Sequence, residues 1–166
     1  MRVKGTVEWC GPLEMLNRLA KQNNKNVSIG HFAEQGIHPG SEITYVELMQ
    51  LHHTGNRANR IPVRDILGIL FRHNTELVKK DRVIRKAINA FMMSQMTDAD
   101  ADILLDAVGK RMAKKEKDIF GKTPPLAPNS KLTQSLKGGR NTPMVDTGEL
   151  KSKVRYKKST KNTLEQ

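Results

Sequence analysis

The sequence predicts an α+β fold, in which a small antiparallel or mixed sheet is packed by several amphipathic helices and carries an extended loop or arm. Apolar residues recur at helical spacing in several segments, whereas segments 27–32 and 150–156 alternate as strands do. Segment 122–142 is instead rich in proline, glycine, serine, asparagine and lysine, as surface loops are. The 166 residues suffice for one domain with a modest core.

The first third of the chain predicts a strand between two helices. A proline at the first helical position and leucines at helical spacing predict a helix over 12–22. The strand 27–32 follows, and the Gly-containing segment 33–40 is expected to be a loop. Ser41 is a suitable N-cap for the second helix, which Gly55 ends. The inward face of that helix is expected to consist of Ile43, Val46, Met49 and His53.

The middle of the chain predicts two further helices. Residues 56–60 form a polar loop, and 61–67 are expected to be a short helix or an irregular segment. Apolar spacing predicts a helix over 75–93. Another helix begins after Thr97 and ends before Gly121, with acidic residues at its start and basic residues at its end, as the helix dipole favours. Its apolar stripe is expected to be Ala101, Leu104, Val108 and Met112.

The last part of the chain predicts an arm and then a strand. Three prolines within 124–128 disfavour a continuous helix, so 122–142 is expected to be a long loop or arm. The strand 150–156 follows it. We therefore expect a single domain over 1–156, including the arm, and a basic C-terminal tail over 157–166.

Positive charge is concentrated near the C-terminus. The formal net charge is +12, and residues 107–166 carry 15 Lys/Arg against 5 Asp/Glu. Such asymmetry indicates a basic surface that faces nucleic acid or an acidic protein. Aromatic residues make up only 4% of the chain, which disfavours base stacking and leaves non-specific attraction to phosphates. The residues expected to face DNA or a partner are Lys114, Lys115, Lys117, Lys151, Lys153, Arg155, Lys157 and Lys158.

Several other classes of site lack support in the sequence. Cys10 is the only cysteine, which excludes an intramolecular disulfide and indicates a reducing compartment. The chain has no apolar stretch of about 18 residues, so we expect no membrane partner. It also lacks a Gly-Lys-Ser/Thr phosphate loop, and the adjacent His52 and His53 would point in different directions from a helix. We expect no cofactor and no metal.

The sequence Asp146-Thr147-Gly148 allows two interpretations. An aspartic protease needs two carboxylates that share a proton, so this single loop would require a symmetric dimer and an all-β scaffold. Most of the preceding chain has helical periodicity instead. We therefore expect no catalytic residue here. Asp146 is expected to bond to downstream backbone amides and Gly148 to adopt a positive φ, either in a tight turn before the strand or in a short helical turn.

Five segments together resemble the bacteriophage virion-morphogenesis, or tail-completion (neck), proteins. That family has a Pro-rich stretch, a basic Lys/Gly linker and a Thr-Pro-Leu-Val-Asp-Thr-Gly-x-Leu motif, similar to 124–128, 137–140 and 142–150 here. It also has Ile-His-Glu-Phe-Gly-like and Ile-Pro-Ala-Arg-Pro-Phe-Leu-like segments, similar to 51–55 and 61–67. In this chain Asp65-Ile66 replaces the usual Pro-Phe, and Thr54 replaces an aromatic residue.

The resemblance assigns two groups of residues to assembly. The assembly and turn motif consists of Pro143, Val145, Asp146, Thr147, Gly148 and Leu150. The central motif consists of His52, Gly55, Ile61, Pro62 and Arg64.

The resemblance implies a structural, non-enzymatic virion protein that acts by assembly at the head–tail junction. Such a subunit would be assembled in the host cytoplasm into a homo-oligomeric ring, with six copies the expected number. Its partners would be neighbouring neck, connector and tail-tube proteins, with non-specific contact to genomic DNA in the channel. The nearest alternative is a tail terminator ring protein. A non-specific DNA-binding accessory protein is the alternative from another class, and the protease ranks third.

Overall fold

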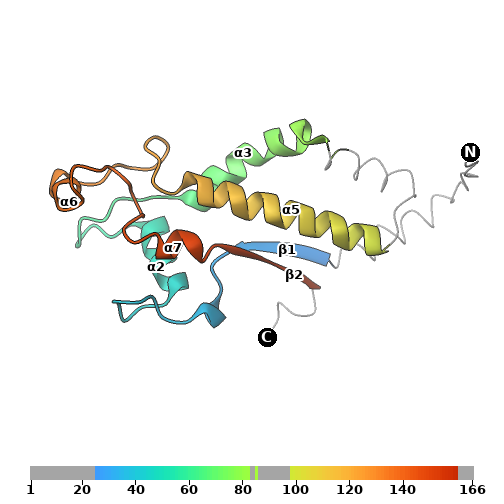
Figure 1. Cartoon of the computed structure of the whole chain (residues 1–166), viewed down its shortest axis with the longest axis horizontal. Helices are drawn as coiled ribbons and strands as arrows, with labels where there is room; N and C mark the ends of the chain where they lie inside the picture. The colour runs from blue at the N-terminus through green and yellow to red at the C-terminus, as the bar shows by residue number, and fades with distance from the viewer. Residues whose placement is uncertain (1–24, 83–84, 86–97, 161–166) are drawn as a thin grey trace, which may run out of the picture.

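The computed structural model describes residues 25–82, 85 and 98–160, which form an α+β fold (Figure 1). These residues contain two antiparallel strands, which form the sheet, and five α-helices. In chain order the elements are β1 (Lys25–Gly30), the 3-10 helix η1 (Ala33–Gln35), α2 (Tyr45–Thr54), α3 (Ile66–Lys80), α5 (Asp98–Ile119), α6 (Lys131–Leu136), α7 (Glu149–Ser152) and β2 (Arg155–Thr160).

The long helix α5 lies along the two strands, with α3 beside it, whereas α2, α6 and α7 gather toward one end of the molecule (Figure 1). The strands pair so that Ile29 lies opposite Tyr156. A Cβ atom on Gly109 would lie only 2.3 Å from Cδ2 of Tyr156, so a glycine is what permits this close approach of α5. The Tyr156 hydroxyl then donates a 2.6 Å hydrogen bond to Asp106 Oδ1.

The apolar core contains residues of α2, α3, α5 and α7. It also includes side chains from the segments between the elements, which anchors those segments to the body. The cluster consists of Tyr45, Met49, Ile66, Ile69, Ala113, Phe120, Leu126, Met144, Leu150 and Val154.

Several of the predicted elements are confirmed. The helix expected between Thr97 and Gly121 is α5, and Ala101 and Met112 of its expected stripe are buried. β1 covers most of the expected strand 27–32. The helix expected over 12–22, the cap Thr97 and most of the helix expected over 75–93 lie outside the described residues.

α3 begins at Ile66, well before the expected start of the third helix. The side chain of Asp65 caps its first turn, since Oδ1 accepts a 2.6 Å hydrogen bond from the backbone N–H of Gly68. Ile66 and Leu70 are buried one turn apart, so tertiary packing extends the helix to this point. Residues 62–65 before it are irregular, as one of the two alternatives predicted.

The prediction that Ser41 caps the second helix is wrong, because Thr44 is the cap of α2. Thr44 Oγ1 accepts from the backbone N–H of Glu47 at 3.2 Å, and the Glu47 carboxylate accepts from the backbone N–H of Thr44 at 2.8 Å. The inward face shifts accordingly. Tyr45 and Met49 are buried, whereas Val46 is 37% exposed. His53, also expected inside, is exposed.

The strand expected over 150–156 is partly wrong as well. Gly148, at φ 86°, precedes the one-turn helix α7, which buries Leu150, and β2 follows only at Arg155. This is the short helical turn that was the second alternative for the motif. β2 continues to Thr160 and so includes the start of the segment expected to be a tail. The arm 122–142 is mostly irregular, as expected for a long loop, but it carries the helix α6.

Candidate functional site

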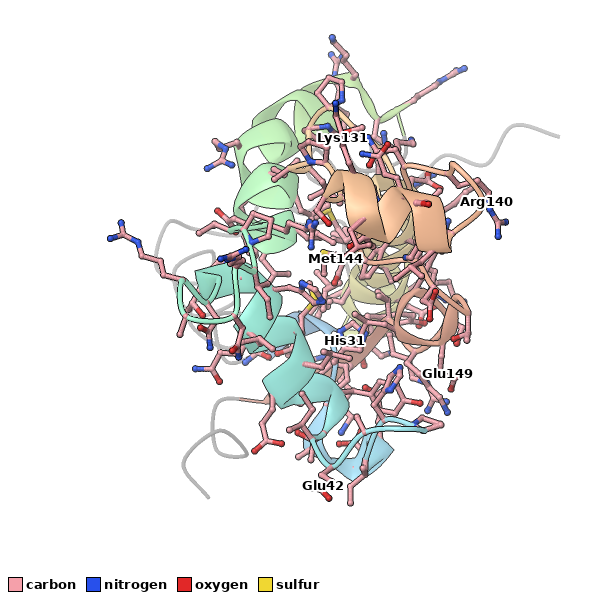
Figure 2. All side chains as sticks on the ribbon, turned by 90° about the vertical axis from the view of Figure 1, so that its left-hand side faces the viewer. His31, Glu42, Lys131, Arg140, Met144 and Glu149 are labelled. Atoms are coloured by element: carbon pink, nitrogen blue, oxygen red, sulfur yellow. The ribbon has the colours of Figure 1, made fainter. Side chains whose placement is uncertain are left out.

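The two motifs meet in one cleft at the end of the molecule where α2, α6 and α7 gather. The cleft has a volume of about 1040 Å³ and is lined by residues 48–64 on one side and 129–150 on the other, with 38–40 at its edge. Figure 2 looks onto this end and shows α6, between Lys131 and Arg140, above Met144. Nine of the eleven predicted motif residues line it: His52, Ile61, Pro62, Arg64, Val145, Asp146, Thr147, Gly148 and Leu150.

The central motif forms the wall that follows α2. Gly55 ends α2 at φ 70°, and a Cβ there would lie 2.9 Å from the backbone oxygen of Ile61. A glycine is therefore needed for the chain to fold back at this point. The backbone N–H of Asn56 donates to Ile61 O at 2.9 Å, and that of Arg64 donates to His52 O at 2.7 Å. These contacts hold His52 and Arg64 together on one wall.

Arg64 joins the two walls of the cleft. Its side chain is 7% exposed, and Nε donates to the backbone oxygen of Ala127 at 3.0 Å. Nη2 donates to the backbone oxygen of Pro128 at 3.1 Å and to Asn129 Oδ1 at 3.2 Å. The Pro-rich segment is therefore bound to the connection between α2 and α3 rather than extending freely.

Asn129 then links the Pro-rich segment to α6 and to the residues before the second motif. Its backbone N–H donates to Asn141 Oδ1 at 2.9 Å, and its backbone oxygen accepts from Gln134 Nε2 at 2.7 Å. Side chains of Asn129 and Arg64 are both buried in this network. The sequence did not predict the hydrogen-bond partners of Arg64 and Asn129, because each contact joins segments that are far apart or irregular.

The second motif is held mainly through its backbone. Lys137 Nζ donates to the backbone oxygen of Val145 at 2.6 Å and lies 3.7 Å from Asp146 Oδ1. The Asp146 side chain is 84% exposed, and the expected bond from it to a downstream amide is absent from the described contacts. Thr147 Oγ1 takes that place, since it accepts from the backbone N–H of Glu149 at 3.3 Å. Gly148 adopts the expected positive φ.

Three polar contacts bind α7 to the N-terminal half of the fold. His31 Nε2 lies 2.8 Å from the backbone oxygen of Leu150, and Gln35 Nε2 donates to the backbone oxygen of Lys153 at 2.6 Å. The Tyr45 hydroxyl donates to Glu149 Oε1 at 2.7 Å. Burial, with the Glu149 carboxylate second, raises the pKa of Tyr45 to about 12.

The residues that line the cleft carry charges of both signs. Burial, assisted by the charge of Arg64, lowers the pKa of His52 to about 4, so His52 is neutral at pH 7. Burial also lowers the pKa of the Arg64 guanidinium from its usual value. Asp146 and Glu149 line the second wall. In the described part of the chain, no carboxylate forms an ion pair with Arg64.

A second groove, between α5 and the start of β2, is strongly basic. Lys110, Lys114, Lys117 and Arg155 line it, together with three uncharged residues. Lys110 forms a 2.6 Å ion pair with Asp106 one turn earlier. The structure therefore brings together three of the eight predicted basic residues and adds Lys110, whose helical spacing from Lys114 and Lys117 could have indicated it.

The other predicted basic residues do not line that groove. Lys153 Nζ lies 5.5 Å from the centre of the Tyr45 ring, and Lys157 Nζ forms a 2.5 Å ion pair with Glu34. The remaining three are Lys115 on α5, Lys151 on α7 and Lys158 on β2. The eight residues thus do not all line one groove.

Across the described residues, no three His, Cys, Asp or Glu side chains are grouped as metal ligands would be. Within the same ranges, none of the helices is both long and apolar enough to span a bilayer. No protein-family model, curated protein or solved structure matches the chain.

Proposed function

We propose that this chain is a structural subunit of a tailed bacteriophage that completes the neck of the virion by assembling into a ring. The observation that supports the proposal most is that two motifs far apart in the sequence, 51–67 and 142–150, line opposite walls of one cleft. These are the stretches that resemble the virion-morphogenesis family. Segments that resemble one family separately and also meet in space are expected to serve a common purpose, here the contact between subunits.

Apolar side chains exposed beside the cleft also support assembly. Leu132 and Leu136 lie one turn apart on α6 and are 72% and 81% exposed, and Leu132 lines the cleft. Single exposed apolar residues are common, but a pair on one helix face next to a cleft is typical of a contact surface. We propose that this pair packs against the next subunit in the ring.

Replacing both leucines with glutamate tests this surface. We expect the unchanged protein to form a closed oligomer in sedimentation velocity and native mass measurements, with six copies the expected number. The Leu132→Glu/Leu136→Glu double variant should remain a monomer with an unchanged melting temperature, because both side chains are exposed in the monomer. Ile103→Glu is the matched control, since Ile103 is 68% exposed on α5, away from the cleft, and should still assemble.

Two results would contradict the proposal. One is unchanged protein that stays monomeric with both connector and tail tube present, and the other is a double variant that assembles normally. Binding to the tail tube but not to the connector would favour the tail terminator, the nearest alternative in the same class.

The basic groove supports a second candidate function, a non-specific DNA-binding accessory protein. Lys114 and Lys117 lie one turn apart on α5 and share the groove with Arg155, an arrangement that can follow a phosphate backbone. Such a protein would bind free duplex DNA with an affinity that falls steeply with salt, and Lys114→Glu/Lys117→Glu would reduce that affinity. Lys131→Glu on α6 is the control. A ring subunit should instead show little affinity for free DNA.

A further inference from the structure

We infer that the cleft contains a binding site for a carboxylate, which an acidic residue in a segment of a partner protein presents to the buried guanidinium of Arg64. The site lies where the connection between α2 and α3 meets residues 127–129. The inference depends on the side chains of the cleft and not on a place in a virion, so it goes beyond the function proposed above.

The charge of Arg64 is the first argument. Its side chain is 7% exposed, and its three hydrogen-bond acceptors are two backbone oxygens and an amide oxygen, all of them neutral. No carboxylate within the described ranges forms an ion pair with it. A buried cation is costly unless an anion compensates it. The positive charge of Arg64 therefore has no compensating anion among the described residues.

Unused hydrogen-bond donors are the second argument. Arg64 uses Nε and Nη2, whereas Nη1 has no acceptor among the described residues. A guanidinium only donates, so the Asn129 atom that faces it must be the oxygen, which leaves Nδ2 as a donor. That Nδ2 atom is buried without a partner. Nη1 is not among the atoms closed to solvent, so a carboxylate oxygen in the cleft can accept a charge-assisted hydrogen bond from it.

The surroundings of Arg64 favour a peptide carboxylate over a nucleic-acid phosphate. Leu48, Ile61 and Met144 line the cleft and offer apolar contact to the residues flanking an acidic side chain. Asp146 and Glu149 lie on the opposite wall and would repel a polyanion such as DNA. A volume of about 1040 Å³ is sufficient for a few residues of a peptide.

Two short peptides, which differ only in a side-chain carboxylate or amide, test the inference on the unchanged protein. The first is acetyl-Leu-Ala-Glu-Ala-Leu-amide, and the second has glutamine in place of glutamate. Binding is measured by NMR, from the side-chain N–H signal of Arg64 and the ring signals of His52. The glutamate peptide should bind about tenfold or more tightly than the glutamine peptide, because only it supplies the missing charge. The Arg64 signal should shift only with the glutamate peptide.

Further arms identify the source of the carboxylate. A third peptide, with glutamine in the middle and a free carboxyl terminus, distinguishes a chain end from a side chain, and tighter binding of this peptide than of the glutamate peptide would overturn the assignment to an acidic side chain. Inorganic phosphate represents a nucleic-acid phosphate, and tighter binding of phosphate than of any carboxylate would overturn it. Equal binding of the glutamate and glutamine peptides, or no binding of either, would also overturn it and leave Arg64 as a clamp for residues 127–129.

Substitutions locate the bound peptide without disturbing Arg64. Asn59 is exposed and lines the cleft, so Asn59→Trp should weaken the glutamate peptide severalfold by obstructing the opening. Ala58 is exposed beside it but does not line the cleft, and Ala58→Trp should bind like the unchanged protein. Equal effects of the two changes would place the peptide elsewhere and contradict the inference.

Discussion

The two ends of this molecule are stabilised by different kinds of contact. Where α5 lies along the sheet, close apolar packing dominates, and the ring of Tyr156 fits against Gly109 with no room for a methyl group. At the cleft end, the long side chains of Arg64 and Lys137 instead hold irregular backbone by its carbonyl oxygens. The first end therefore acts as a rigid frame. The second end has charged groups and hydrogen-bond donors that remain available to a partner. A fully packed core would have no such groups available.

The largest effect we predict is on stability, and it arises from Glu116, a polar residue buried inside the frame. Glu116 on α5 is fully buried, and both of its carboxyl oxygens lack hydrogen-bond partners in the described structure. Burial raises the pKa of Glu116 from its usual 4.5 to about 7. The folded state thus holds this proton to higher pH than the unfolded state does. The contribution of Glu116 to stability is therefore fully present below pH 4.5 and is lost as the pH rises through 7, by about 3 kcal/mol.

Urea denaturation between pH 4.5 and 8 measures this loss. Glu116→Gln keeps the shape of the side chain and removes the ionisation, so its stability should exceed that of the unchanged protein at pH 8 and should not fall over this range. Asp118→Asn is the matched control, because Asp118 is an exposed carboxyl on the same helix, and it should retain the original pH profile. If Glu116→Gln and Asp118→Asn have the same profile, Glu116 is not buried as described.

A smaller effect is predicted for the contact between Gly109 and Tyr156. Gly109→Ala would bring a Cβ within 2.3 Å of the ring, so α5 or the ring must move, at a cost of about 2 kcal/mol. Removing the ring together with its Cγ and Cδ2 atoms by Tyr156→Ala should reverse the sign. In that background, Gly109→Ala should stabilise the protein by about 1 kcal/mol, since alanine is the better helix former.

A double-mutant cycle by urea denaturation measures the Gly109–Tyr156 coupling. Destabilisation by Gly109→Ala in both backgrounds would show that the ring is not the obstacle. It would also weaken the contrast between a tightly packed frame and an open cleft.

Local patterns predicted the frame better than the cleft. The apolar stripe and the charge distribution of residues 98–119 are properties of one continuous segment, so α5 and the α+β class followed from the sequence. The contacts of Arg64 join residues 63 to 65 positions apart, and no periodicity indicates them. The buried Glu116 interrupts an apolar face and could be recognised only once the packing around it was known.

The second motif shows an intermediate case. The positive φ at Gly148 followed from residue type, and a helical turn was one of two alternatives for the residues after it. Which alternative forms depends on Leu150, whose burial against the core requires a turn of helix before β2. Asp146 was expected to make the turn, but Lys137 lies nearby and Thr147 provides the acceptor instead.

Assembly through the cleft end, rather than through the frame, is the central claim, and amide hydrogen exchange tests it most directly. Exchange is compared between the isolated subunit and the oligomer. We predict that protection on assembly increases in α6 and in residues 142–148, whereas β2 and the exposed side of α5 change little. Protection that increases along β2 and α5, with α6 and 142–148 unchanged, would contradict the claim and would assign the contact between subunits to the frame.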